Sequence, residues 1–171
     1  GPQHDWPMHA YIMWLKSQGI EYANPRKEDC KYVRTGMPAE YHQTKWCADR
    51  AIEFIDNVKD FGQPWFFSFN CFDPHHAFDP PPEYLERYMP ILDEIPLPNY
   101  VEGELDDKSP FQRRDHVGAY GVKGSFAYDK MTARDHRLIR AAYWAMCDFI
   151  DVQVGRMLDY LEQSGQWELV A

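Results

Sequence analysis

The chain has 171 residues, with 18 Lys and Arg against 27 Asp and Glu and a hydrophobic fraction of 44%. This length suits one ordinary domain, and this apolar content can fill a core, which excludes a globally disordered chain. The net charge of −9 argues against nucleic acid or an anionic membrane surface as the main partner. No run of about 18 apolar residues is present to span a bilayer. The four cysteines are too few for a disulfide scaffold; as free thiols they fit a reducing compartment such as the cytoplasm, without establishing one.

The two ends of the sequence suggest an internal piece of a longer protein. The chain starts Gly1-Pro2-Gln3 without an initiator Met, and Trp167 to Ala171 resembles a strand cut short. The alternative is a complete domain with a cloning remnant and a frayed end. Under the first interpretation, a missing signal peptide carries no information.

The first half of the chain predicts two helices and one strand. His9 to Gln18 has apolar residues at helical spacing, and residues 20–40 resemble a loop. Tyr41 to Val58 predicts a second helix whose apolar stripe consists of Cys47, Ala51, Phe54, Ile55 and Val58. Trp65 to Cys71 is short, bulky and mostly apolar, which predicts a strand buried on both faces rather than a buried helix.

The second half predicts one long helix after a proline-rich loop. Asp73 to Pro82 contains too many prolines for a helix, and residues 89–131 look irregular after a helical turn near Glu83. The long helix begins with a capping box at Thr132 and stops at Gly165, and the last four residues predict the next strand. The order strand, helix, strand is typical of an α/β fold.

The His75-His76 loop is the main candidate for chemistry. It directly follows the predicted strand, and open α/β sheets bind ligands at that end of their strands. An imidazole there can donate a hydrogen bond to an anionic oxygen or move a proton near neutral pH, and the neighbouring prolines would hold it still. The alternative is a histidine that caps the loop or faces solvent. A metal site is disfavoured, because adjacent histidine side chains diverge on an extended backbone.

The other polar candidates favour structural roles. Surface or cap positions are expected for the isolated histidines His4, His9, His42, His116 and His136. Arg113, Arg114 and Lys123 are expected in a solvated loop rather than at an anion-attracting rim. Asp148 and Asp151 are expected at a solvated rim of the long helix rather than as a functional carboxylate pair. Gly155 inside the long helix suggests a close backbone contact. Three cysteines (Cys47, Cys71 and Cys147) are interpreted as small core residues, and none of the four has the neighbours of a catalytic nucleophile.

Two blocks of sequence resemble the middle of type I sulfatases. The first is Phe66-Phe67-Ser68-Phe69 followed by Asp73 to Pro81, and the second runs from Ala141 to Leu158. These enzymes belong to the alkaline phosphatase superfamily, together with phosphonate monoester and phosphodiester hydrolases. The resemblance implies that residues 1–171 are an internal segment of a single sulfatase-type catalytic domain. It also implies an α/β fold that is part of an α/β/α sandwich, with a mostly parallel central sheet that is incomplete in this chain.

The same resemblance implies a metal-dependent hydrolase of small-molecule sulfate esters. The family uses a formylglycine made from a Cys-x-Pro-x-Arg motif and a calcium-type divalent cation held by Asp residues. Cys30 does not fit the motif, because Tyr32 stands where Pro is needed, and no metal ligand is expected here. Only His75 carries over, as the catalytic residue that binds the ester oxygens and can protonate the leaving group. Ala77 departs from the Pro that often follows that histidine. The segment alone should therefore be inactive.

Two competing interpretations stay open. A phosphonate monoester or phosphodiester hydrolase of the same superfamily would share these residues. A non-catalytic α/β module could instead bind a partner through its aromatic surface. A homo-oligomer is compatible with the sequence in either case.

Overall fold

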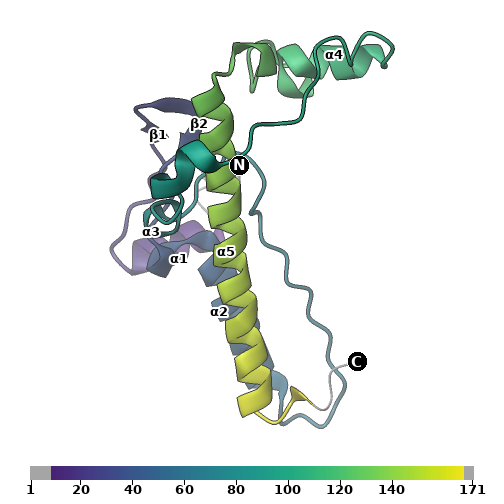
Figure 1. Ribbon diagram of the computed structural model, residues 1–171. Coiled ribbons are helices and arrows are strands. Elements are labelled where there is room, and N and C mark those ends of the chain that lie inside the picture. Colours follow the sequence, from purple (N-terminus) through teal and green to yellow (C-terminus); the bar gives the residue numbers. More distant parts are fainter. Residues whose placement is uncertain (1–8, 168–171) are drawn as a thin grey trace.

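The computed structural model describes residues 9–167, which are organised along one long helix, α5 (Ala133–Gln163) (Figure 1). A capping box starts this helix: the Asp135 amide donates to the Thr132 hydroxyl at 3.1 Å, and the Thr132 amide donates to the Asp135 carboxylate at 2.8 Å. Gly165, with φ of +70°, follows its end. Both predicted ends of the long helix are thus confirmed.

The two other predicted helices are also present. They are α1 (Ala10–Ser17) and α2 (Gln43–Val58), with a single 3-10 turn at Ala39–Tyr41 between them. The residues of α2 that are buried against the rest of the chain are Thr44, Ala48, Ala51 and Ile55, so the predicted stripe is correct at two of its positions. A polar contact also joins α2 to α5, because Arg156 donates to the Asp49 carboxylate at 2.7 Å.

Residues 20–40 are not simply a loop. They contain an antiparallel hairpin of β1 (Arg26–Lys27) and β2 (Cys30–Arg34), with an irregular register. Val33 of β2 makes an isolated parallel bridge to Phe78. The two strands are short and their register is irregular, so their residues show little of the alternation between apolar and polar side chains that marks a strand. The sequence therefore did not predict them.

The expectation of a strand buried on both faces at Trp65 to Cys71 is wrong. This segment is extended, but it pairs with no strand in the described part of the chain. Figure 1 shows it as coil that runs beside α5. Its side chains alternate between exposed and half-buried, and Phe66 is 86% exposed. The residues are suited to burial, but burial requires neighbours on both faces, and residues 9–167 do not supply them.

The predicted parallel sheet is likewise not found. The described residues are mostly helical, and their sheet is the two-stranded antiparallel hairpin. The remaining helices are α3 (Pro82–Leu85) and α4 (Pro110–Val117), with 3-10 turns at Met89–Glu94, Ala119–Gly121 and Tyr128–Lys130. Residues 89–131 are therefore more regular than expected. The strand predicted for the last four residues lies outside the described residues.

The main core forms where β2, α3 and the turn after it pack on α5. Small side chains on α5 (Ala141, Ala142 and Ala145) are fully buried between Leu138 and Phe149 and allow close approach. Tyr84 packs edge-to-face on Phe149 with ring centroids 4.9 Å apart. Gly155 is not part of such a contact, because a Cβ there would meet nothing within 4 Å, so that expectation is wrong. No helix within residues 9–167 is long and apolar enough to cross a membrane.

Candidate functional site

The loop that carries His75 is fastened to β2 at its C-terminal side. The Arg34 amide donates to the Phe78 carbonyl at 2.8 Å, and the Gly36 amide donates to the Pro80 carbonyl at 3.1 Å. A Cβ at Gly36 would lie 2.0 Å from the Asp79 carbonyl oxygen. The backbone of the loop can approach this closely only because position 36 is a glycine.

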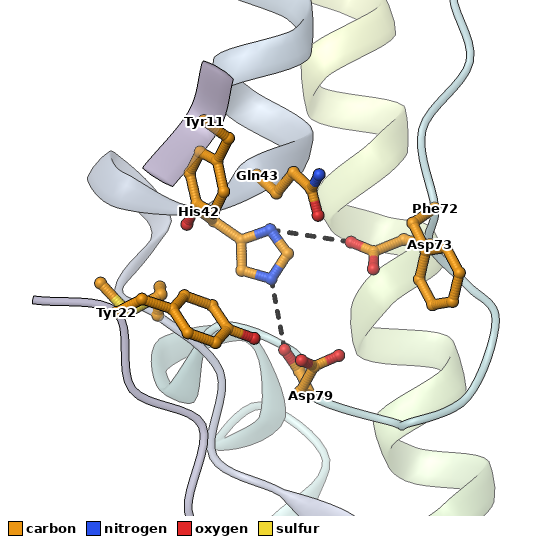
Figure 2. Close-up of a pocket in the computed structure, with 8 residues that line it drawn as sticks. Tyr11, Tyr22, His42, Gln43, Phe72, Asp73 and Asp79 are labelled. Atoms are coloured by element: carbon orange, nitrogen blue, oxygen red, sulfur yellow. Dashed lines mark hydrogen bonds and ion pairs between the residues drawn. The ribbon is translucent and has the colours of Figure 1, made fainter. Parts of the chain in front are cut away.

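His42 joins both ends of the same loop (Figure 2). Its Nδ1 accepts a hydrogen bond from the Thr44 amide at 3.3 Å, which caps α2, and its Nε2 donates to the Asp79 carbonyl at 3.2 Å. An amide can only donate and a carbonyl can only accept, so these two contacts fit the tautomer with its proton on Nε2. The ring is 5% exposed and packs edge-to-face on Phe149. The predicted cap role is confirmed, but the residue is buried rather than at the surface.

The buried carboxylate of Asp73 fixes the other end of the loop. The Thr44 hydroxyl donates to its Oδ2 at 2.5 Å, and the same oxygen lies 3.7 Å from Nδ1 of His42. These contacts surround a small cavity of about 20 Å³, which has room for about one water molecule. Asp73 lies 29 residues after Thr44 in the sequence, and only the N-cap position of His42 before a Thr could have drawn attention to this group.

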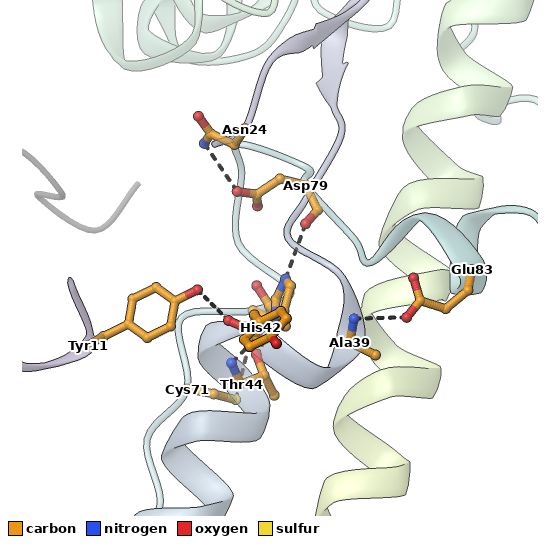
Figure 3. A network of polar contacts seen from close by, with 10 residues as sticks. Tyr11, Asn24, Ala39, His42, Thr44, Cys71, Asp79 and Glu83 are labelled. Atoms are coloured by element: carbon orange, nitrogen blue, oxygen red, sulfur yellow. Dashed lines mark hydrogen bonds and ion pairs between the residues drawn. The ribbon is translucent and has the colours of Figure 1, made fainter. Parts of the chain in front are cut away.

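Asp79 lies on the same cavity, and its environment favours the neutral acid. Burial raises the pKa of its carboxyl, and the charge of Asp73 adds to this rise against the opposing hydrogen bond from Asn24. That bond joins Asn24 Nδ2 to Asp79 Oδ2 at 3.3 Å (Figure 3). Burial also raises the pKa of Tyr11 and of Tyr22, which line the cavity. Asp79 therefore anchors the loop through both its carboxyl group and its backbone carbonyl.

His75 itself is exposed, with one ring nitrogen engaged. Its Nδ1 lies 2.5 Å from the carbonyl oxygen of His76. A carbonyl only accepts, so Nδ1 carries the proton, and Nε2 is the atom left to bind a ligand. The ring contacts Phe72 on one side and stacks on His76 at 4.1 Å. Burial, and then the neighbouring His75, lower the pKa of His76, which therefore stays neutral at neutral pH.

The remaining candidates are not brought to this loop. Arg113 and Arg114 are solvated as expected, but they lie on helix α4 rather than in a loop, and Arg114 pairs with Asp115 at 3.5 Å. Asp148 accepts from the Tyr88 hydroxyl at 2.6 Å. Cys30 is buried, whereas the three cysteines expected in the core are only half-buried. Burial raises the pKa of all four thiols, that of Cys47 to about 11, so all four are protonated at neutral pH and are poor nucleophiles.

A divalent cation does not fit the described residues. Within residues 9–167 there is no group of three or more His, Cys, Asp or Glu side chains placed to hold a metal ion. In the cavity beside His42, one oxygen of Asp73 is already used by Thr44, and Asp79 favours its protonated form. The donor set that a calcium-type ion needs is therefore lacking in this part of the chain.

Comparisons with known proteins identify relatives for almost the whole chain. It is 25% identical over 182 residues to the multifunctional alkaline phosphatase superfamily protein PehA of Trinickia caryophylli, a match that covers 94% of this chain and 34% of that protein. It is 28% identical over 131 residues to an arylsulfatase of Clostridium perfringens, with 77% and 25% covered. The human iduronate 2-sulfatase is 28% identical over 127 residues, with 69% and 22% covered. No protein-family model matches the chain.

A solved structure shows the same fold. The phosphonate monoester hydrolase SpPMH from Silicibacter pomeroyi superposes with a TM-score of 0.70 at 21% identity, over 94% of this chain and 34% of that one. The chain thus has the fold of one part of this phosphonate monoester hydrolase. The resemblance predicted from the sequence is confirmed: this chain is a relative of the sulfatases and of other alkaline phosphatase superfamily proteins. It spans between 22% and 34% of the length of these three curated relatives.

Proposed function

We propose that this chain is part of a longer hydrolase that cleaves small-molecule sulfate esters, and that it contributes His75 to the active site. The supporting observation is the state of that side chain. His75 is exposed, its Nδ1 is engaged by the His76 carbonyl, and the loop around it is fastened through His42, Thr44 and Gly36. Two of the relatives carry the names arylsulfatase and iduronate 2-sulfatase.

The proposed role follows from the free nitrogen of the ring. When Nε2 of His75 carries a proton, it can donate a hydrogen bond to the ester oxygens as negative charge develops on them. The same proton can pass to the leaving oxygen, which is general acid catalysis. His76 cannot readily replace it, since its ring is held between His75 and Tyr120 and its pKa is lowered.

Neither the metal ligands nor the formylglycine motif of the resembling family is found in the part of the chain where each can be examined. Its described residues do not fit a divalent cation, and none of its cysteines lies in a Cys-x-Pro-x-Arg motif. Residues outside the described range 9–167 would have to hold the metal, and a residue beyond this sequence would have to become the formylglycine. We therefore expect residues 1–171 alone to hydrolyse no sulfate ester, which a purified sample and an aryl sulfate would test.

A phosphonate monoester hydrolase is the second candidate. It is supported by the named activity of SpPMH, which covers 94% of the chain, and by the multifunctional relative PehA. The deciding experiment compares kcat/KM of the full-length protein on 4-nitrophenyl sulfate and on a phosphonate monoester with the same leaving group. A higher value for the sulfate supports a sulfatase, and a higher value for the phosphonate supports the alternative. Hydrolysis of neither would contradict the enzymatic proposal and favour a binding module.

A further inference from the structure

An open groove lies next to His76, outside the His42 cavity. It has a volume of about 430 Å³ and is lined by His76, Phe78, Asp115, Ala119, Tyr120 and Phe126. We call it the aromatic groove. Its size falls within the range of about 300–1,000 Å³ that is usual for small-molecule sites, and its lining is mostly apolar, as in such sites.

The aromatic rings of the groove support one another. Phe126 packs edge-to-face on Phe78 at 5.7 Å and on His76 at 5.2 Å. Phe78 is in turn held by the backbone contact to β2, and Phe126 also contacts the buried Tyr32 at 5.7 Å. These walls are therefore built on the main core. Tyr120 differs, because it is 70% exposed and presents its ring at the rim.

The backbone at two of these rings is unusual. Tyr120 has a φ of +58° and Phe126 a φ of +45°, and they are the non-glycine residues with positive φ within residues 9–167. A bulky side chain rarely adopts this region, and such residues concentrate at ligand sites, where neighbouring structure imposes the conformation. Here both positions contribute a ring to one groove, which supports the groove as a ligand site.

The groove begins one ring away from the proposed catalytic histidine. The rings of His75, His76 and Tyr120 form a nearly parallel stack, with centroids 4.1 Å and 5.2 Å apart and interplanar angles of 27° and 25°. A molecule whose reacting oxygen meets Nε2 of His75 could therefore extend past His76 into the groove. The part of an ester that extends away from the sulfur is its leaving group.

We propose that the aromatic groove binds an uncharged aryl leaving group of the ester, an inference that rests on the proposed function. Ring faces and edges pack well on an arene. A sugar would bring several hydroxyls, whereas most of the lining is apolar and offers few hydrogen-bond partners for them. Arg114 already pairs with the Asp115 carboxylate at 3.5 Å, so the lining offers no free cation to an arene with its own negative charge.

The test compares two leaving groups of similar acidity on the full-length protein: phenyl sulfate and hexafluoroisopropyl sulfate. Tyr120→Ala should lower kcat/KM for phenyl sulfate at least about fivefold, because the phenyl ring would no longer pack on an aromatic partner at the rim. It should change the value for the alkyl ester less than twofold, and Tyr120→Phe should restore the wild-type value for phenyl sulfate. Equal losses on both esters, or no loss on either, would overturn the proposal. A larger loss on a monosaccharide sulfate than on phenyl sulfate would overturn the aryl assignment.

A second variant tests the charge selectivity. Asp115→Asn should raise kcat/KM for 4-carboxyphenyl sulfate several-fold relative to phenyl sulfate, because it removes the carboxylate from the lining and frees its partner Arg114. An unchanged ratio would contradict the place of the aryl ring in this groove. If the wild-type protein hydrolyses none of these esters, the proposed function itself fails. If it hydrolyses them and the variants do not discriminate, only the groove assignment fails.

Discussion

Replacing His42 separates its two structural roles. His42→Asn keeps a side chain that can accept from the Thr44 amide and cap α2, but it is too short to replace the Nε2 contact with Asp79. His42→Gln can reach the Asp79 carbonyl, but glutamine is a poor cap. The two variants form a matched pair of nearly equal size and polarity.

The expected magnitudes follow from the hydrogen bond that each variant removes. His42→Asn leaves the Asp79 carbonyl without its donor, and an unsatisfied buried acceptor costs roughly 1–3 kcal/mol. His42→Gln removes the cap, which costs roughly 0.5–2 kcal/mol. We expect His42→Asn to destabilise the loop of residues 73–79 and His42→Gln to destabilise the first turn of α2.

Hydrogen exchange of the full-length protein measures both effects locally. The Arg34 and Gly36 amides donate to the carbonyls of Phe78 and Pro80, so they report opening of the loop. His42→Asn should speed their exchange about tenfold for each 1.4 kcal/mol of stability removed, whereas His42→Gln should leave them nearly unchanged. Equal exchange rates at Arg34 and Gly36 in the wild type and in His42→Asn would refute the idea that His42 holds the loop.

Two further predictions concern backbone approach and pH. Gly36→Ala should markedly lower the melting temperature, because the added Cβ would overlap the Asp79 carbonyl. Gly155→Ala is the control: its Cβ would meet open space, and the change should stabilise the folded protein by about 1 kcal/mol. Similar melting temperatures for the two variants would contradict this prediction. The pKa of Asp79 is higher in the folded than in the unfolded protein, so its protonated form adds to the free energy of unfolding. This contribution is complete below the unfolded-state pKa of about 3.9 and is lost as the pH rises through the folded-state pKa. Asp79→Asn should therefore gain stability relative to wild type between acid and neutral pH in urea unfolding, and parallel curves would contradict it.

The helices could be predicted from the sequence because their signals are local. Thr132 and Asp135 form the capping box, and Gly165 ends the same helix with the positive φ that glycine favours. The segment Trp65 to Cys71 shows the opposite case. Its composition indicates a buried strand, but strand formation depends on partners, and the described chain leaves Phe66 exposed.

The candidate site could be predicted only in part. His75 was identified by its place in the sulfatase-like block, and its catalytic role stays a prediction. The hydrogen bonds from Thr44 to Asp73 and from His42 to Asp79 span 29 and 37 residues, so no local pattern reveals them. The aromatic groove depends on backbone angles at Tyr120 and Phe126, which side-chain identity does not indicate.

The catalytic role of His75 is the central claim, and turnover of a single variant tests it most directly. In the full-length protein, His75→Ala should lower kcat on an aryl sulfate at least about 100-fold, because the ring is proposed to donate the proton or stabilise the developing charge. His136→Ala, at the start of α5, is the control and should keep the wild-type rate. A loss of less than about threefold in His75→Ala, well below the usual contribution of a general acid, would contradict the account.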